Sequence, residues 1–539
     1  MNTWTLGIDA STQSISAVVV DAGTSPARTV IEHSIAYRED RRLNRYGIEG
    51  ESLLVPPRVP GEADQPPRMF LAALDALFSD LVAAGIDMSK IGAVSVSAQQ
   101  HGHVYLAEAG LTVIEALARP GAGSRGPDLA ARFREAFSYG TAPIWQTADS
   151  QPDADEIRAA LGGTRRVVEL SGSDSPARFT GAVIRRTARR FPEAWRQTVR
   201  VSLLSSFLSG VLSGTDCPID WGNGAGMTLM DYRHRRWSDE LVDAVAADRA
   251  GGTAALKKAL PPPASPVDIA GPIAAYFVER YRFSPECIVN VGSGDNPQSK
   301  VMIDGDLLSL GSSFVYMVDT GEPTVDLQGY ANSMYDGIGR PFVFACRTNG
   351  AMVWDRLRNA YGVDYAGAER ALAAVAPGGA AGTAPVIWQP YAESYPVAPP
   401  VPNPAAADGT GRFEELYPGV VDSALVLTRH YARGFETGEG ILALTGGPAA
   451  SREIVRRVAA VFERPVVVLG SSGAAMGSAL SAWTTLCATT GDDPELSRVR
   501  ADLVPPEVQV EPDADLVSAY QEATPRIVDA FEDAAYRKG

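Results

Sequence analysis

The chain has 539 residues, of which 45% are hydrophobic, so it is long and apolar enough to fill two or more cores of ordinary size. Its 64 acidic residues outnumber the 48 basic ones, and the resulting net charge of −16 disfavours binding to nucleic acid and to anionic membranes. We therefore expect at least two domains, small-molecule partners, no nucleic acid and no membrane.

Other bulk features point the same way. A short basic cluster lies on an amphipathic stretch and is interpreted as a solvated helix face; it comprises Arg185, Arg186, Arg189 and Arg190. The four cysteines have no metal-ligand or disulfide-dense spacing, which is typical of buried thiols in a reducing compartment. Residues 1–9 do not resemble a signal peptide, and no apolar stretch is long enough to span a bilayer. A cytoplasmic protein is predicted.

The chain opens with a predicted hairpin. Residues 4–9 and 17–21 indicate strands, and the turn between them is rich in hydroxyl groups. Hydrophobic residues at helical spacing between 68 and 85 predict a helix, and residues 91–97 alternate as a strand that leads directly into the polar segment 99–102. Open α/β sheets bind ligands at such strand ends.

Prolines at 261–263 and 266, followed by a predicted helix over 273–281, mark the expected hinge. We therefore predict domains over 1–265 and 266–539. The second half repeats the opening pattern, with predicted strands at 287–292, 307–310, 441–445 and 465–469 and a helix between the last two. Strands that alternate with helices indicate layered α/β domains, and the similar openings suggest the same architecture twice.

Three turns offer backbone N–H groups and small residues, which phosphate binding requires. They are Ala10–Ser14, Gly311–Ser313 and Gly446–Gly447. Each alone is more typical of an ordinary hairpin or of a strand-to-helix connection. Their recurrence after apolar strands favours phosphate binding.

Two acids, Asp9 and Asp295, directly follow apolar strands at glycines. In phosphoryl transfer one carboxylate commonly positions magnesium while another takes the proton of the attacking hydroxyl. We expect the two acids in separate domains, which suits that division. The alternatives are a turn-stabilising aspartate at Asp9 and a helix N-terminal residue at Asp295.

Donors and acceptors gather beyond the strand 91–97, as polyol recognition requires. They are Gln99, Gln100, His101 and His103. The two histidines lie two positions apart with no further ligand motif, so a zinc site is not predicted.

Together these segments resemble the FGGY carbohydrate kinase family, and most of all its xylulokinase members of the eukaryotic-like branch. The resemblance runs through nearly the whole chain, and its most specific motifs are Val96–Gly102, Ala177–Gly181, Leu203–Leu208, Pro218–Asp220 with Gly224–Met227, and Arg280–Pro285 with Gly294–Pro297.

The resemblance implies a fold and a reaction. The fold is α/β, with two actin-like (ribonuclease H-like) domains flanking a catalytic cleft; the first holds mainly the sugar and the second the nucleotide. The implied reaction uses ATP and Mg²⁺ to convert D-xylulose to D-xylulose 5-phosphate, and a homodimer is the family expectation.

The resemblance also implies roles for individual residues. Asp295 matches the general base, and the sugar-binding positions match Gln100, His101, Arg178, Asp295 and Asn296. Asp9 matches the magnesium position, directly or through water. The first phosphate loop matches Ser11, Thr12 and Gln13, and the second matches Gly311, Ser312 and Ser313. The adenosine side matches Trp354, Gly446, Gly447 and Ser451.

Three positions depart from the family pattern. Ser451 replaces an asparagine near the nucleotide; Thr147 stands where an aspartate is expected, with Asp149 two positions late; and Gly222 and Asn223 replace a serine and an aspartate. These departures leave open a kinase for another sugar or polyol, such as ribulose, ribitol or gluconate. Two alternatives of other classes are a sugar- or nucleotide-binding regulator without turnover and an actin-like chaperone ATPase, which would need a peptide-binding module that the sequence does not show.

Overall fold

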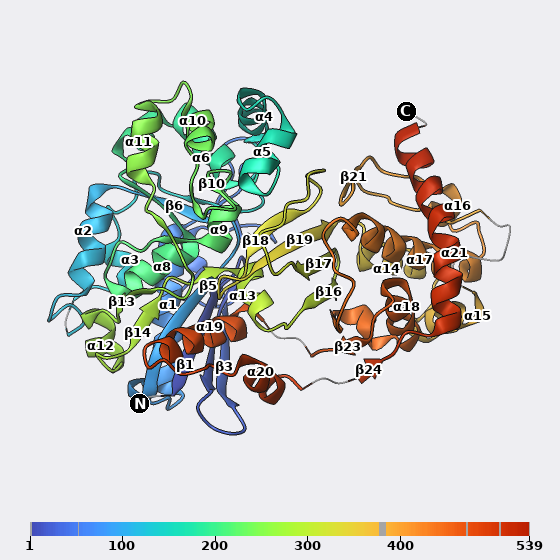
Figure 1. Ribbon diagram of the computed structural model, residues 1–539. Helices are drawn as coiled ribbons and strands as arrows, with labels where there is room; N and C mark the ends of the chain where they lie inside the picture. Colours follow the sequence, from blue (N-terminus) through green and yellow to red (C-terminus); the bar gives the residue numbers. More distant parts are fainter. Residues whose placement is uncertain are drawn as a thin grey trace. The chain divides into compact units, whose positions relative to one another are not determined.

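The computed structural model describes residues 3–51, 53–124, 126–376, 384–470, 473–505 and 508–537. The chain forms two compact units (Figure 1). Unit 1 comprises Met1–Met302, Ser333–Pro341 and Ser472–Leu503, and unit 2 comprises Ile303–Asn332, Phe342–Ser471 and Val504–Gly539.

Unit 1 is built on a seven-stranded sheet in the order β13-β14-β5-β1-β2-β3, with β15 also paired to β5. β1, β2 and β3 run antiparallel, β5 and β14 continue in parallel, and β13 is antiparallel at the edge. The strands span Trp4–Ala10 (β1), Ser14–Asp21 (β2), Arg28–Ala36 (β3), Ile91–Ala98 (β5), Ile269–Pro272 (β13), Ile288–Asn290 (β14) and Ser293–Gly294 (β15).

Unit 2 is built on the second seven-stranded sheet, in the order β18-β19-β17-β16-β22-β23-β24; its edge strand β18 falls almost wholly in the segment Ser333–Pro341 of unit 1. The strands span Asp306–Leu310 (β16), Phe314–Asp319 (β17), Asn332–Tyr335 (β18), Pro341–Arg347 (β19), Leu442–Thr445 (β22), Val466–Val468 (β23) and Val508–Val510 (β24). From β19 to β24 the strand directions repeat those from β3 to β13 in the first sheet. The predicted repetition of one architecture is confirmed.

Helices complete both units. Those of unit 1 are α1 (Pro67–Ala83), α2 (Glu108–Leu117), α3 (Leu129–Arg132), α4 (Gln151–Ala160), α5 (Thr164–Ser171), α6 (Thr180–Arg190), α7 (Pro192–Gln197), α8 (Leu204–Ser213), α9 (Trp221–Ala225), α10 (Asp239–Ala246), α11 (Gly252–Ala259), α12 (Ala275–Tyr281), α13 (Asp295–Val301), α19 (Ala474–Ala488) and α20 (Leu496–Leu503). Those of unit 2 are α14 (Ala351–Ala360), α15 (Tyr365–Ala374), α16 (Pro404–Ala407), α17 (Phe413–Ala432), α18 (Arg452–Phe462) and α21 (Ala514–Glu532).

Short two-stranded ladders lie outside the main sheets. They pair β4 (Asp64–Gln65) with β7 (Ala142–Pro143), β6 (His103–Leu106) with β8 (Arg200–Leu203), β9 (Ile219–Asp220) with β12 (Pro263–Ala264), β10 (Met230–Asp231) with β11 (Arg236–Trp237), and β20 (Glu393–Ser394) with β21 (Val397–Ala398). No helix in the described part of the chain is long and apolar enough to cross a membrane.

The chain returns to unit 1 after building most of unit 2. In Figure 1 the orange-red α19 lies against the blue β1. The approach is so close that a Cβ on Gly7 would stand 1.9 Å from the carbonyl oxygen of Ala475, so only glycine fits there. Residues 266–302 also belong to unit 1, because β14 and β15 pair with β5. The compact units therefore divide elsewhere than at the expected boundary of 265/266.

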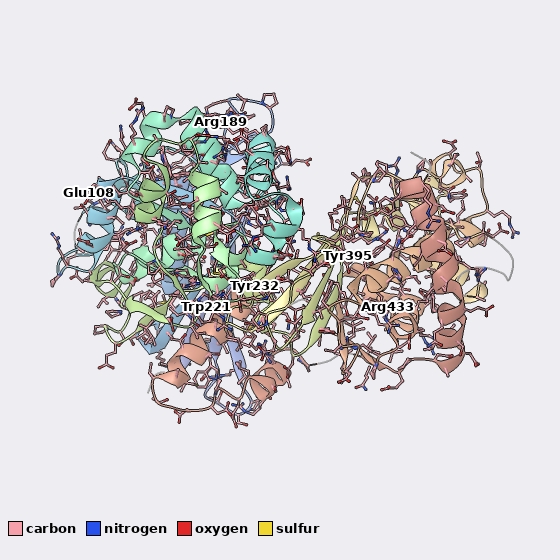
Figure 2. The ribbon with its side chains drawn as sticks, turned by 45° about the horizontal axis from the view of Figure 1, so that its top comes forward. Glu108, Arg189, Trp221, Tyr232, Tyr395 and Arg433 are labelled. Carbon is pink, nitrogen blue, oxygen red and sulfur yellow. The ribbon has the colours of Figure 1, made fainter. Side chains whose placement is uncertain are left out.

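The interpretation of the basic cluster on α6 as a solvated helix face is wrong for two of its four members. The side chains of Arg185 and Arg186 are buried, and Arg186 is 0% exposed. Arg186 lies 3.4 Å from Asp149 and 3.8 Å from Asp64, and Arg189, labelled in Figure 2, pairs with buried Asp153. Buried arginines are tolerated because acids surround them.

Candidate active site

His101 follows the end of β5 in an unusual backbone conformation. Its φ of +64° lies in the left-handed region, which non-glycine residues adopt chiefly at turns and functional sites. Nδ1 lies 3.1 Å from the carbonyl oxygen of Gly226 and donates to it, because a carbonyl can only accept. Burial and then the positive charge of Arg178 lower the pKa of His101 to about 3. The ring is therefore neutral, and its Nε2 is an acceptor suited to a hydroxyl group.

Asp295 is the first residue of α13, directly after β15. Its Oδ1 accepts from the backbone N–H of Asn296 at 2.8 Å and from that residue's side-chain amide at 3.1 Å. The half-buried carboxyl has its pKa raised to about 7, first by removal from water and then by the negative charge of Asp9. A carboxylate with such a pKa can take a proton near neutral pH.

Asp9 lies near the end of β1, opposite Ser97 of β5. The Ser97 hydroxyl donates to Asp9 Oδ1 at 2.6 Å, while burial raises the pKa of the Asp9 carboxyl. Both Asp9 and Asp295 belong to unit 1, which differs from the expectation of one acid in each domain. The shared sheet explains this, because β1 and β15 both pair with β5.

The strand ends fit together tightly. A Cβ on Gly294 would stand 2.2 Å from Gln100 Oε1, so the backbone before Asp295 approaches Gln100 closely. The Gln100 backbone N–H donates to the Asp295 carboxyl. Through these contacts the structure brings together Asp9, Gln100, His101, Arg178, Asp295 and Asn296 in unit 1.

The first predicted phosphate turn is the tip of the β1–β2 hairpin. The backbone N–H of Ser11 donates to the carbonyl oxygen of Ser14 at 2.9 Å, which closes the turn, and Gln13 is exposed. Thr12 Oγ1 donates to Gln99 at 3.2 Å and accepts from Trp145 Nε1 at 3.0 Å. Trp145 is 43% exposed, so a large aromatic surface lies beside this turn. The sequence predicts no role for Trp145, although its place at the start of the family's tryptophan-x-aspartate pattern is a signal for one.

The departure at Asn223 belongs to a buried network around Asp220. The Asp220 carboxylate accepts from the backbone of Asn223 at 2.9 Å, from its side chain at 2.6 Å and from the Ser293 hydroxyl. Burial raises the pKa of Asp220 to about 6. Asn223 also receives a hydrogen bond from Gln100, at 3.4 Å. The asparagine thus links Asp220 to the predicted sugar-binding segment.

The departure at Gly222 has a steric reason. A Cβ at this position would stand 2.6 Å from the carbonyl oxygen of Tyr335, which leaves no room for the family's serine. Tyr335 is held by aromatic contacts with Trp221 and Tyr232, whose ring centroids lie 5.9 Å and 4.9 Å away (both labelled in Figure 2).

The family's aspartate is expected at position 147, where this chain has Thr147. The nearest aspartate, Asp149, is engaged by arginines. Asp149 accepts from Arg190 at 2.5 Å and lies 3.4 Å from Arg186. Thr147, at the family position, is buried and donates to the carbonyl oxygen of Ala63 at 3.2 Å. Neither side chain offers a free carboxylate to a sugar, so this part of the site differs from the family pattern.

Two of the predicted phosphate turns meet in unit 2. The backbone N–H at the start of α14, Ala351, donates to the carbonyl oxygen of Gly311 at 3.0 Å. Gly446 has a φ of +100°, and a Cβ there would stand 2.3 Å from the carbonyl oxygen of Leu310. The turns Gly311–Ser313 and Gly446–Gly447 therefore lie side by side at the ends of β16 and β22, which are parallel neighbours.

A cavity of about 670 Å³ adjoins the turn Gly446–Gly447 in unit 2. Its lining includes Trp354, Gly447 and Ser451, three of the residues predicted on the adenosine side. The Ser451 hydroxyl accepts from the backbone of Ile454 at 3.1 Å, which caps α18, and donates to Glu369. Ser451 thus fixes the cavity wall, and its side chain is not free to replace the amide of the family's asparagine.

The side chains of the candidate site fit Mg²⁺ only as an ion held by a single carboxylate. Within the described residues, no group of three or more His, Cys, Asp or Glu side chains is placed to hold a metal ion. Mg²⁺ commonly takes one or two carboxylates and completes its shell with waters and substrate phosphates. The partly exposed Asp9, beside a hydroxyl-rich turn, fits that mode.

Comparison with known proteins gives a consistent result. No model of a known protein family matches the chain. The rat xylulose kinase is 28% identical over 503 residues, which cover 90% of this chain and 89% of that protein. Xylulose kinase 2 of Arabidopsis thaliana is 34% identical over 330 residues, 60% of this chain and 56% of that protein. The crystal structure of xylulose kinase from Rhodospirillum rubrum superposes with a TM-score of 0.77 over 98% of both chains at 16% identity.

The repeated sheets in two units match the two-domain fold of the sugar kinases of known structure. Over 90% of its length the chain is similar to xylulose kinases in sequence, and its fold is that of sugar kinases of known structure.

Proposed function

We propose that the protein transfers the terminal phosphoryl group of ATP to the terminal hydroxyl of D-xylulose, forming D-xylulose 5-phosphate and ADP. One observation carries the proposal: Asp295 is held by hydrogen bonds from Asn296, directly after a backbone that packs against Gln100 at the strand end that also bears His101. The raised pKa of Asp295, about 7, supports the same role. The choice of D-xylulose as the acceptor rests on the similarity to xylulose kinases.

Asp295 is the proposed general base. As the sugar oxygen forms its bond to the γ-phosphorus, the bond between that phosphorus and the β–γ bridging oxygen breaks, and the hydroxyl proton passes to the Asp295 carboxylate. The hydrogen bonds from Asn296 hold the carboxylate in one orientation. The sugar hydroxyls would meet neutral His101 as an acceptor, Arg178 as a donor, and Gln100 Oε1, a buried acceptor with no hydrogen-bond partner among the described residues.

The phosphate and magnesium side involves fewer side chains. Asp9 would hold Mg²⁺, directly or through water, with the turn Ser11–Gln13 as a source of N–H and hydroxyl donors. Bound Mg²⁺ neutralises charge on the phosphates and thereby aids departure of ADP. In unit 2, the turns Gly311–Ser313 and Gly446–Gly447 would bind phosphate, and the cavity lined by Trp354 would receive the adenosine.

The test is ADP release with MgATP against D-xylulose, D-ribulose, L-ribulose, ribitol, gluconate and glycerol. We expect turnover led by D-xylulose and lost in Asp295→Ala. Turnover led by another acceptor would keep the kinase and change its substrate. Nucleotide binding without turnover on any acceptor would favour a regulator that lacks catalysis.

Location and assembly stay predictions. We infer a cytoplasmic enzyme from the cysteine pattern; Cys217, Cys287 and Cys487 are buried free thiols in the structure. A homodimer is proposed from the family alone. Light scattering coupled to gel filtration distinguishes a mass of 57.0 kDa from twice that value.

A further inference from the structure

A second, much smaller cavity lies in the core of unit 2. Its volume is about 10 Å³, which is close to the minimum that holds one water molecule. Its lining includes Arg347 from the end of β19, Trp354 from α14, and Gln389. Trp354 lines both this cavity and the large cavity proposed to bind adenosine.

The residues around this cavity carry polar atoms with unmet hydrogen-bonding capacity. Trp354 Nε1, Arg347 Nε and both amide atoms of Gln389 are buried and have no hydrogen-bond partner among the described residues. Each of these side chains is only 2% exposed. Buried polar atoms are rarely left unpaired, so several around one water-sized cavity indicate a shared partner.

Direct contacts do not meet this need. Arg347 Nε lies 3.6 Å from Glu393 Oε2, too far for a hydrogen bond, and Arg347 Nη1 reaches only the carbonyl oxygen of Tyr395 at 3.3 Å (Tyr395 is labelled in Figure 2). Arg347 Nε therefore keeps a donor hydrogen that a water molecule could accept.

We propose that one ordered water occupies this cavity, accepts from Trp354 Nε1 and Arg347 Nε, and donates to Gln389 Oε1. Gln389 is then a positioning residue that acts through the water to fix the indole of Trp354. The effect on nucleotide binding rests on the proposed function, whereas the water site itself does not.

The chemistry favours water over an ion. A cation is disfavoured by the Arg347 guanidinium. An anion would satisfy the N–H donors but could not donate to Gln389 Oε1, and Glu393 already balances the charge of Arg347. Water alone both accepts and donates within so small a volume.

The first test is a crystal structure of the whole chain at about 1.8 Å resolution, with a parallel bromide soak. We expect an isolated density peak within about 3.2 Å of both Trp354 Nε1 and Gln389 Oε1, without anomalous signal from bromide. An empty or collapsed cavity, or a bromide peak at this position, would overturn the water assignment.

The second test compares Gln389→Leu with Ile387→Val, which removes a methyl group from the same cavity lining without changing a polar group. MgADP affinity is measured by titration calorimetry, and steady-state rates give the ATP KM and kcat. We expect Gln389→Leu to weaken MgADP binding and raise the ATP KM about fivefold, with kcat at saturating ATP within about twofold. Ile387→Val should stay within about twofold on every measure.

If Gln389→Leu does not fold, Gln389→Met serves as the second variant. Equal behaviour of the Gln389 and Ile387 variants would refute the positioning role. A wild-type protein that binds no MgADP would refute the proposed nucleotide site and this role with it, while the crystal structure would still decide on the water.

Discussion

Replacing Asp295 by asparagine should change activity and stability in opposite directions. Asparagine keeps the shape and an acceptor oxygen for the N–H groups of Asn296 and Gln100, but it cannot take a proton. Because a positioned general base contributes about 10²- to 10⁴-fold, we expect kcat on the sugar to fall by at least about 100-fold.

The stability effect follows from the raised pKa. Between the ordinary value of 3.8 and the folded-state value of about 7, the folded protein binds this proton more tightly than the unfolded chain does. Protonated Asp295 therefore stabilises the folded protein at low pH. This contribution to the free energy of unfolding is lost as pH rises from about 4 to 7. The full shift sets an upper limit of about 4 kcal/mol; because water screens part of this half-buried site, we expect Asp295→Asn to gain roughly 1–3 kcal/mol at pH 8.

Two assays check this reasoning. In ADP-release kinetics, the wild-type kcat/KM for the sugar should fall about tenfold per pH unit below pH 7, and Asp295→Asn should lack this limb. Calorimetry at pH 8 should give the variant a melting temperature a few degrees higher, with the gain shrinking towards pH 4.

Asp75→Asn is a matched control, since this buried acid accepts hydrogen bonds from Tyr276 and Tyr281 instead. It should keep the pH limb. An Asp295→Asn variant that keeps more than a tenth of the activity, or that is less stable than wild type at pH 8, would refute the base assignment.

Three further predictions address other parts of the chain. His101→Asn keeps a residue that tolerates positive φ but removes the imidazole acceptor; at saturating ATP the sugar KM should rise roughly fivefold, the value of one neutral hydrogen bond, and an unchanged KM would contradict the assignment. Gly222→Ser should lower the free energy of unfolding in urea by about 1–3 kcal/mol, because the new Cβ meets the Tyr335 carbonyl oxygen, and a neutral result would show that the backbone yields. Asp422→Ala should cost about 3–5 kcal/mol in denaturant unfolding, because it leaves buried Arg457 without its partner at 2.5 Å; a loss below about 1 kcal/mol would mean that water replaces the carboxylate.

Local pattern was sufficient for most strands and helices. The apolar run at 91–97 became β5 (Ile91–Ala98), and the helical spacing at 68–85 became α1 (Pro67–Ala83). Apolar periodicity indicates which face of a segment is buried, and small residues after a strand indicate a turn. Both features depend on neighbouring residues and not on distant contacts, so the sequence alone is enough to predict them.

Pattern could not say to which unit a segment belongs. Residues 266–302 and helix α19 have ordinary apolar faces. Their own sequence does not indicate which of the two sheets they pack against. That choice depends on close contacts distant along the chain, such as Gly7 against Ala475. The predicted boundary at 265/266 therefore followed composition instead of packing.

The candidate site shows a similar limit. His101 and Asp295 were found because a motif places each at a strand end, but the left-handed backbone of His101 has no sequence signal. Arg186 was interpreted as solvated because its partners, Asp64 and Asp149, lie far away in the chain. Charge pairing across such separations is visible only in three dimensions.

The return of the chain to unit 1 also sets an order of events during synthesis. β1 is made first, but α19, whose Ala475, Ala479 and Leu480 are buried, is made more than 400 residues later. At about 5–20 residues per second, the ribosome needs roughly 25 to 95 s before α19 can cover β1. During that interval the first sheet exposes apolar surface to the cell. Unit 1 therefore cannot reach its native packing before unit 2 is largely synthesised, and a chain that stops before residue 474 would leave β1 uncovered.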